Sequence, residues 1–425
     1  MTQPNLIVIT LHDAGRHFGC YGVNGFSTPC IDRLAAEGVR CTNMFAASPV
    51  CSPSRAAMNT GQYPQRNGLM YLVHEPFLWT LNNPSDHLAA RLRTHRYETV
   101  LARFQHETHG DPAELGFDKT IANRHCPGPE AAREVTAFLQ QRDDPRPFYI
   151  QFGMFESHTP YDFGGAIPTE DRPGIVPDWV EDNPESRAHF SGLEGAILQA
   201  DQAVGTVLDT LETLGLADNT VIVLTVDHGI EAGGLRAKWS CYERGIEIAY
   251  VVRWPIGGID GGRECDSLLS NVDHTATMLH LLGCPDGCVS DGVSFADGLR
   301  GQEPSRPPRE HVFGMYSTGS ESRYVRSSRY KLIRNFGQCR WPVMPIDLNA
   351  PGLTRMQTRP ALEFYDLQQD PGELHDLSSN ASIQAELGVL DRRLIDHLVA
   401  LDDPILCGPI RTPYYESAIK TLPAR

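Results

Sequence analysis

The sequence predicts an α/β fold in which helices flank a large, mostly parallel sheet, with a smaller C-terminal α+β subdomain that contains an antiparallel sheet. Short, almost wholly apolar segments recur through most of the chain, which is typical of strands buried in a parallel sheet. Helical segments separate them, and this alternation favours the α/β class. The composition of the chain changes at the Pro-rich, charged stretch GQEPSRPPRE. We therefore expect one domain over residues 1–300 and a smaller one over 301–425.

The strands of the large sheet are expected at four apolar runs. These are NLIVITL (5–11), FYIQFGM (148–154), VIVLTV (221–226) and IEIAYVV (246–252). Beyond the Pro-rich stretch, short segments such as SRYVRSSRYKLIRNF suit an antiparallel sheet.

Capping residues mark the expected helices. Thr28 and Pro29 fit the N-cap and first residue of a helix that Gly38 ends. Ser85 is expected to cap a further helix. Two longer helices are expected over residues 187–214 and 382–401.

Charge and composition exclude several classes of partner. The chain has a net charge of −16, which argues against nucleic acid and anionic membranes as partners. No stretch approaches the length of a membrane span, and MTQPNLIVIT lacks the pattern of a signal peptide. Eleven cysteines are scattered without a C-x-x-C pair. We therefore expect a cytoplasmic protein, in which any site for an anion must be locally positive.

The stretch CSPSRAAMNTG places a cysteine beside a helix start. Ser52 fits the N-cap, Pro53 the first helical residue and Gly61 the end. Cys51 then lies just ahead of the N-terminus, where free N–H groups and the helix dipole favour an anion. Arg55 follows one turn later and adds a fixed positive charge. The alternative interpretation is a small buried cysteine before an ordinary capped helix.

The pattern Cys-x-Pro-Ser-Arg followed by Thr-Gly resembles the formylglycine-dependent sulfatase family of the alkaline phosphatase superfamily. Further segments resemble that family in the same order along almost the whole chain. They are LHDAG, STPCIDRLAAEGV, YETVLARFQHE, FGMFESHTPY, ILQADQAVGTVLDTLETLGLADNTVIVLTVDHG, YERGIEIAYVVRWP and FYDLQQDPGELHDLS. The resemblance implies that residues 1–300 form the catalytic domain. It also implies that a maturation enzyme converts Cys51 to formylglycine, whose hydrate is the nucleophile.

The resemblance implies a metal site formed by Asp13, Asp227, His228 and the oxygen of residue 51. Carboxylates at the ends of separate strands suit calcium. Read alone, Asp227-His228-Gly229 is also consistent with a turn after a strand. His12 is a departure, since the family has a second aspartate there. A histidine ligand would give manganese or zinc more weight, and a core histidine without a metal is the alternative.

Three further residues take catalytic or substrate-binding roles by resemblance. Lys238 matches the lysine that binds the sulfate oxygens. His158 matches the histidine beside the leaving-group oxygen, and His106 matches the histidine that holds or deprotonates the hydrate. Fixed cations would stabilise the charge that builds up during sulfate transfer, and histidine suits a proton donor. A structural role remains the alternative for either histidine.

A second departure is Phe104, which stands where the family has a lysine two residues before the position of His106. One positive charge that faces the substrate is therefore missing. Arg16, His17 and His74 are candidates to replace it in space.

The substrate class is inferred from the continuation NGLMYLVH, which resembles the heparan N-sulfatase (sulfamidase) branch. It implies a small sulfated or sulfamidated saccharide such as N-sulfoglucosamine. The alternatives are an O-sulfatase or arylsulfatase, a phosphonate or phosphate ester hydrolase on the same metal platform, and an inactive binding homologue. The intact Cys-x-Pro-Ser-Arg argues against a binder. A cysteine phosphatase or protease would not explain the order of the metal ligands. A homo-oligomer is left open.

Overall fold

The computed structural model describes residues 3–169, 175–231, 236–284, 290–303, 309–317, 321–337 and 359–420. Within these residues, eight strands form one large sheet in the order β5-β4-β6-β1-β7-β8-β2-β9. The strands are β1 (Asn5–Leu11), β2 (Val39–Cys41), β4 (Glu98–Arg103), β5 (Lys119–Ile121), β6 (Phe148–Gly153), β7 (Thr220–Val226), β8 (Tyr250–Arg253) and β9 (Arg263–Cys265).

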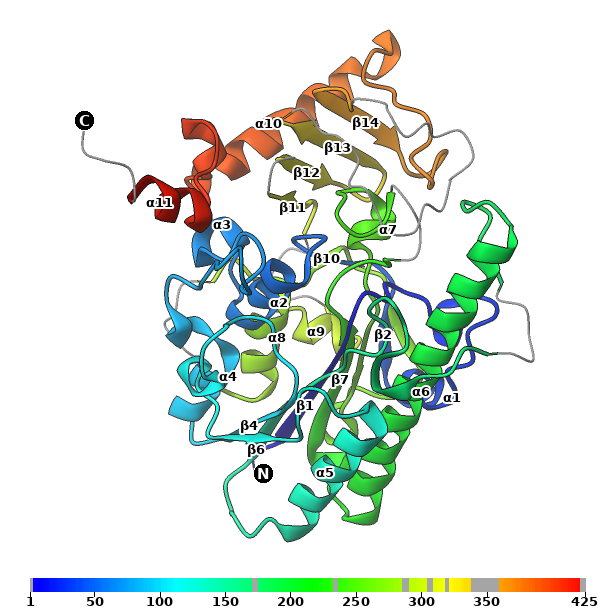
Figure 1. The fold of residues 1–425 in the computed structure, drawn as a ribbon, viewed down its shortest axis with the longest axis vertical. Helices are drawn as coiled ribbons and strands as arrows, with labels where there is room; N and C mark the ends of the chain where they lie inside the picture. The colour runs from blue at the N-terminus through cyan, green and yellow to red at the C-terminus, as the bar shows by residue number, and fades with distance from the viewer. Residues whose placement is uncertain are drawn as a thin grey trace.

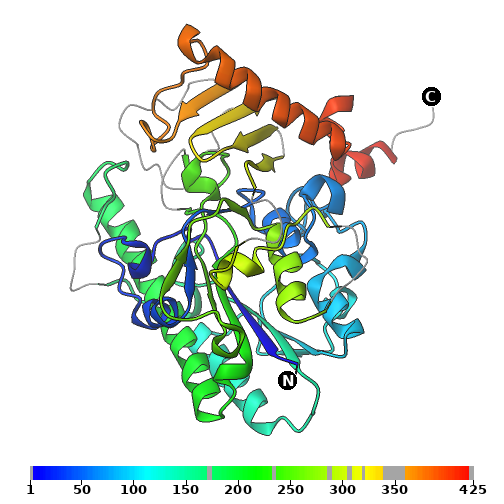
Figure 2. The ribbon, with the colours of Figure 1, turned by 180° about the vertical axis from the view of Figure 1, so that it is seen from behind.

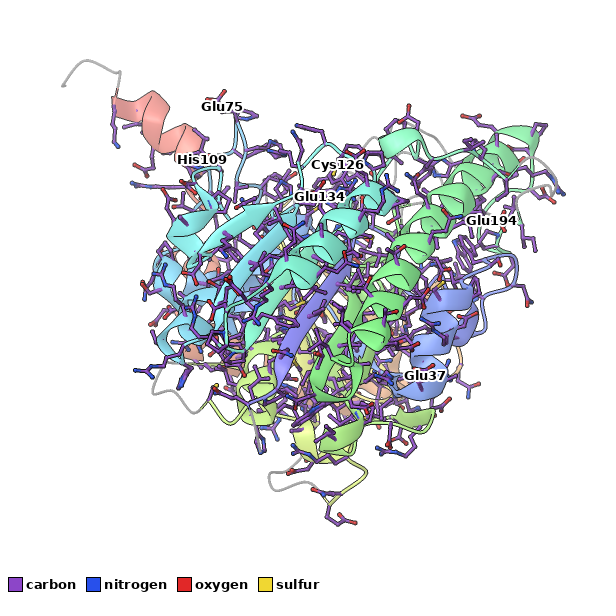
Figure 3. The ribbon with its side chains drawn as sticks, turned by 90° about the horizontal axis from the view of Figure 1, so that it is seen from below. Glu37, Glu75, His109, Cys126, Glu134 and Glu194 are labelled. Atoms are coloured by element: carbon purple, nitrogen blue, oxygen red, sulfur yellow. The ribbon has the colours of Figure 1, made fainter. Side chains whose placement is uncertain are left out.

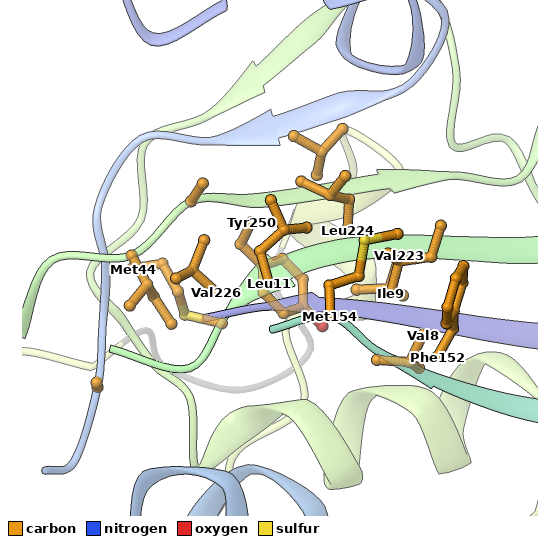
Figure 4. Close-up of a cluster of buried hydrophobic side chains, with 14 of the residues drawn as sticks. Val8, Ile9, Leu11, Met44, Phe152, Met154, Val223, Leu224, Val226 and Tyr250 are labelled. Carbon is orange, nitrogen blue, oxygen red and sulfur yellow. The ribbon is translucent and has the colours of Figure 1, made fainter. Parts of the chain in front are cut away.

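The large sheet is mostly parallel, as predicted. Strands β5, β4, β6, β1 and β7 run in the same direction, and β8 runs antiparallel to β7 and β2. Every residue of β1 is buried between β6 and β7. Figure 4 shows its side chains packed with those of both neighbours, including Ile9 with Leu224 and Phe152. Each such side chain contributes roughly 1.5–3 kcal/mol on burial.

Helices cover both faces of this sheet (Figures 1 and 2). One face carries α1 (Pro29–Glu37), α5 (Gly128–Gln141) and α6 (Pro184–Thr213), and the other carries α2 (Cys51–Thr60), α4 (Leu88–Thr94) and α8 (Asp273–Leu281). Shorter helices are α3 (Pro64–Asn67), α7 (Glu243–Ile246), α9 (Ala296–Leu299) and α11 (Pro413–Lys420). Strands β3 (Met44–Phe45) and β10 (Leu269–Ser270) form a small parallel pair.

The second large sheet is antiparallel and C-terminal, as predicted. It contains β11 (Val312–Tyr316), β12 (Ser322–Arg326), β13 (Tyr330–Asn335) and β14 (Leu362–Asp366), in that order. Helix α10 (Gln384–Ala400) packs its leucines against one face. The sheet also joins the main core, since Tyr324 Oη donates to Ala46 O at 2.8 Å. The proposed division at residue 300 stays a prediction, and part of GQEPSRPPRE lies outside the described residues.

Three expected boundaries are wrong. Helix α2 begins at Cys51, and its N-cap is Val50, not Ser52. Val50 has an extended backbone, and its carbonyl oxygen already accepts the first helical hydrogen bond, from Ser54 N at 3.0 Å. The cap of α4 is His87, whose ring accepts from Ala89 N at 3.1 Å, and Ser85 belongs to a short 3-10 turn.

The third concerns the run 246–252, where the strand begins only at Tyr250 because the short helix α7 occupies the start. None of the helices in the described part of the chain combines the length and the apolar character needed to cross a bilayer.

Candidate active site

Two carboxylates meet where the adjacent strands β1 and β7 end. The register pairs Leu11 with Val226, so Asp13 and Asp227 both emerge at the carboxyl edge of the sheet. Asp13 N donates to Asp227 Oδ1 at 3.0 Å, and both side chains are fully buried. Asp13 has φ +50°, a left-handed conformation that costs an ordinary residue about 1 kcal/mol or more. Strain of this kind is concentrated at functional sites.

Helix α2 brings Cys51 to these carboxylates. Because Cys51 is the first helical residue, its side chain lies at the positive end of the helix dipole. Cys51 Sγ is 3.4 Å from His228 Nε2 and 3.9 Å from His12 Nδ1. Burial raises the pKa of the Cys51 thiol, but Lys238 and the two imidazoles outweigh it and hold that pKa well below the ordinary value.

Five buried side chains therefore converge on one point. One ligand atom from each of them lies within 4.8 Å of the others; the residues are His12, Asp13, Cys51, Asp227 and His228. His228 Nδ1 lies 2.9 Å from Gly229 O, so it donates there and leaves Nε2 to face Asp13 Oδ1 at 2.9 Å. His12 presents Nδ1 to the same Asp13 oxygen at 2.6 Å.

The donor set fits a divalent cation. Two buried carboxylates in contact repel one another unless positive charge lies between them. Burial lowers the pKa of His12 and His228, yet the neighbouring carboxylates raise the former to about 9 and the latter well above its ordinary value. The cluster thus has a strong demand for positive charge, which a bound cation meets. The structure brings together all the residues that the sequence proposed for a metal.

Two cations of the chain lie beside the cluster. Arg55 Nε is 3.1 Å from Asp227 Oδ2, with its side chain 1% exposed. Lys238 Nζ is 2.5 Å from Asp13 Oδ2 and 3.6 Å from Glu231 Oε2. Burial lowers the pKa of Lys238, but Asp13 and Cys51 raise it above its ordinary value, so the ammonium stays charged.

His158 and His106 also lie at the cluster. His158 Nε2 is 3.5 Å from Lys238 Nζ and 3.8 Å from Asp13 Oδ2. Its Nδ1 lies 2.6 Å from Thr159 O, so in the neutral ring Nδ1 donates and Nε2 accepts. Burial lowers the pKa of His158 to about 4 and also lowers that of His106. His106 Nδ1 is buried without a hydrogen-bond partner among the described residues.

Several basic residues surround Phe104, which stands where the sulfatase family has a lysine. The ring lies 5.4 Å from that of His106, and His74 stacks on His106 at 5.6 Å. The guanidinium carbon of Arg55 lies 5.2 Å from the centre of the Phe104 ring, and that of Arg124, which the sequence analysis missed, lies 5.9 Å from it. No motif marks Arg124, because it comes from the loop after β5.

Arg16 and His17 do not lie near Phe104. They line a separate cavity of about 680 Å³ beside Trp179 and Arg244, whereas His74 and Phe104 line one of about 860 Å³. Arg16 is also paired with Glu247 at 2.7 Å. Of the three basic residues considered as replacements, the structure therefore places His74 alone beside Phe104.

Glu231 is a further residue that the sequence analysis missed. It is buried beside Lys238 and accepts from Thr159 Oγ1 at 2.9 Å. Burial and the neighbouring Asp13 raise the pKa of Glu231 to about 7. It lies in the same segment as Asp227, but no spacing in the sequence distinguishes it from a surface glutamate.

Comparison with known proteins identifies relatives along nearly the whole chain. A family model described as Sulfatase matches residues 4–284, which is more than half of the chain. An ulvan-active sulfatase of Formosa agariphila is 26% identical over 97% of this chain and 84% of its own length. Human arylsulfatase A is 27% identical over 88% of this chain and 83% of its own.

A solved structure shows the same fold. It is that of a protein in complex with its substrate D-glucosamine-2-N,6-O-disulfate, with a TM-score of 0.77 and 18% identity. The match covers 95% of this chain and 99% of the other.

Proposed function

Since this chain belongs to the sulfatase family and hydrolyses sulfate esters, we propose that its substrate is a small sulfated saccharide and that residue 51 is its nucleophile. The observation that carries this proposal is the position of Cys51. It begins helix α2 and lies within hydrogen-bonding distance of His228, beside two buried carboxylates and Lys238. An inactive binding homologue has no need for this arrangement.

We propose that Asp13, Asp227, His228 and His12 hold a divalent cation together with the oxygen of matured residue 51. Calcium is expected first from the two carboxylates, and two imidazole donors give manganese or zinc more weight. When present, the aldehyde hydrate supplies the oxygen that attacks sulfur, and the cation stabilises negative charge on that oxygen.

The residues of the chain position the reacting groups. Arg55 holds Asp227 in place, and Lys238 presents a charged ammonium beside residue 51 that can bind the sulfate oxygens. His158 Nε2 faces Lys238 and accepts in the neutral ring. A bound sulfate is an anion and raises the pKa of an imidazole that it contacts. We therefore propose that substrate binding charges His158, which then protonates the leaving oxygen or nitrogen.

Two features support a saccharide as the leaving group. The relatives include an ulvan-active sulfatase, and the structural neighbour was solved with a disulfated glucosamine. The cavity beside His106 has a volume of about 860 Å³, which lies in the range of pockets for small molecules. Within this class we propose N-sulfoglucosamine as the first substrate to test, because NGLMYLVH resembles the sulfamidase branch.

The test is sulfate release by protein produced together with a formylglycine-generating enzyme. The substrates are 4-nitrophenyl sulfate, N-sulfoglucosamine and O-sulfated monosaccharides. The mass of the tryptic peptide covering residues 41–55 reports maturation of residue 51. We expect release by the matured protein and none by Cys51→Ala, whereas the exposed Cys407→Ala control keeps full activity. Sulfate release by protein whose residue 51 is wholly unmodified cysteine would refute the nucleophile assignment.

A further inference from the structure

We propose that the cavity beside Phe104 and His106 binds a second anionic group of the substrate, a carboxylate or a further sulfate, and that Arg124 selects for it. This inference rests on the proposed function, because it takes the reacting sulfate to lie at residue 51.

The position of the cavity suits the part of the substrate that is not hydrolysed. Its wall includes Phe104, whose ring centre is 5.7 Å from that of the cluster residue His12. His106 lines the same wall and its ring lies 6.4 Å from that of His12. A saccharide whose sulfate lies at Cys51 therefore extends into this cavity. The volume of the cavity, about 860 Å³, is several times larger than a sulfate ion requires.

The cavity is lined by more basic than acidic side chains. Its lining residues include two arginines and three histidines but a single acid, Glu75. Figure 3 labels Glu75 and His109, which lie at the same end of the molecule. The chain as a whole has a net charge of −16. An excess of basic over acidic side chains therefore distinguishes this cavity from the rest of the chain. An arginine in such a concave site attracts anions if its charge is not already compensated.

The two arginines differ in what they can offer a ligand. Arg103 is buried and paired with Glu156 at 2.7 Å, so its charge is already compensated. Arg124 is exposed, and no carboxylate in the described part of the chain forms an ion pair with it. Its charge is thus available to a ligand.

Phe104 holds this free guanidinium in place. The 5.9 Å between the Arg124 guanidinium carbon and the ring centre is within the range of a cation–π contact. An exposed guanidinium that contacts an aromatic ring still has N–H groups with which to bind an anion. Those groups match the two oxygens of a carboxylate or sulfate. The aromatic residue that removes a lysine from the reacting site therefore positions an arginine farther out.

His74 adds a donor or acceptor on the same wall. Its ring is nearly parallel to that of His106, with 14° between the planes. His74 Nδ1 lies 2.8 Å from Glu75 O, so it donates there and Nε2 remains for the ligand. Arg124 and His74 thus line one cavity from two different loops.

The experiment measures binding by calorimetry, with full-length Cys51→Ala protein so that no turnover intervenes. The reference probe is 2-O-sulfoglucose, which carries one anion. Two further probes carry a second anion, namely 2-O-sulfoglucuronic acid with a carboxylate and glucosamine-2-N,6-O-disulfate with a second sulfate. We expect at least one of the latter to bind about tenfold more tightly than the reference, which corresponds to one bidentate charged contact. The probe that gains identifies the group.

Two variants assign the preference to Arg124. We expect Arg124→Gln to reduce the tenfold preference to less than twofold. Arg133→Gln removes the same charge from the exposed side of α5 and should keep the preference. A preference that is absent from the parent protein, or that survives in Arg124→Gln, would overturn the inference, as would a lack of binding by both dianionic probes.

The outcome is separable from that of the proposed function. If the dianionic probes bind through Arg124 but matured protein releases no sulfate, the proposed function falls and the anion site stands. If sulfate is released and the preference does not depend on Arg124, the anion site alone falls.

Discussion

At the scale of single residues, the site depends on matching buried charges. Asp13 and Asp227 are fully buried, and a buried carboxylate without a partner costs several kcal/mol. Lys238 and Arg55 each approach one of them. Lys238 also lies beside residue 51, so one of the two cations that pair with the carboxylates is the one proposed to bind the sulfate.

Replacing Lys238 tests its role towards the substrate. We expect Lys238→Met to lower kcat/KM for 4-nitrophenyl sulfate by about 10²- to 10³-fold, as is typical when one charge-stabilising donor is lost. The control Lys119→Met removes a half-exposed lysine from the edge strand β5 and should leave kcat/KM within about twofold. A loss of less than about fivefold in Lys238→Met would contradict the assignment.

Removing the cation should affect both stability and activity. A ligand that binds the folded chain alone stabilises it by mass action, and the proposed cation would also screen Asp13 from Asp227. We expect a chelator to abolish sulfate release and lower the melting temperature, and calcium or manganese to restore both. Elemental analysis of the untreated protein identifies the metal. Protein that keeps full activity after complete metal removal would disprove the metal site.

At the scale of elements, strand and helix ends determine which side chains meet. The correction to α2 illustrates this: local capping rules favour Ser52 at the N-cap, but its hydroxyl accepts from Val73 N at 3.4 Å instead. Ser54 is likewise engaged, since its hydroxyl accepts from Asn271 Nδ2 at 2.9 Å. Tertiary hydrogen bonds thus start the helix two residues early and include Cys51 in its first turn.

A buried ion pair connects the C-terminal sheet to the segment after α10. Arg323 Nε is 2.6 Å from Asp403 Oδ2 and its Nη2 is 3.0 Å from Oδ1, with neither side chain exposed. Removing one partner of a buried pair costs about 3–5 kcal/mol. We therefore expect Arg323→Met to lower the free energy of unfolding by that amount in urea titrations.

The matched control for this pair is the bidentate pair of Arg329 with Asp366 on the same sheet, in which the arginine side chain is 45% exposed. Arg329→Met should shift the urea midpoint far less, because water already solvates the Arg329 guanidinium. Equal shifts in the two variants would show that burial does not determine the strength of the Arg323 pair.

At the scale of the whole molecule, the central sheet and the helices on both faces bury several imidazoles. His274 on α8 is fully buried, with Nδ1 2.7 Å from Tyr250 Oη of β8. Burial lowers the pKa of His274 from 6.5 to about 3. The unfolded chain therefore binds a proton below pH 6.5 that the folded chain excludes until about pH 3, so stability falls as the pH decreases through this window.

This linkage predicts a change in the pH dependence of stability. Between pH 6 and 4, His274 contributes a slope of about 1.4 kcal/mol per pH unit to the free energy of unfolding. We expect His274→Asn to reduce the measured slope by that amount, whatever constant cost the substitution adds. An unchanged slope in His274→Asn would mean that the imidazole is protonated in the folded protein.

The sequence by itself determined the α/β class, the first strand, both ends of helix α1 and the cluster of residues proposed for the metal. Apolar runs such as residues 5–11 and the Thr28–Gly38 signals are local, and local patterns report burial and capping directly. Motif order identified Cys51, Asp13 and Asp227, because the two aspartates follow apolar strands and Cys51 lies at a helix start.

Only the tertiary structure decided which residues surround Phe104, because proximity across loops leaves no periodic signal in the chain. Arg124 reaches Phe104 from a loop beyond β5, and Arg16 lies in another cavity despite its place in the sequence beside Asp13. The start of α2 was decided in the same way, since hydrogen bonds from distant segments outweighed the local preference for Ser52. Sequence patterns specify which groups emerge from each element, whereas packing specifies which of them share a surface.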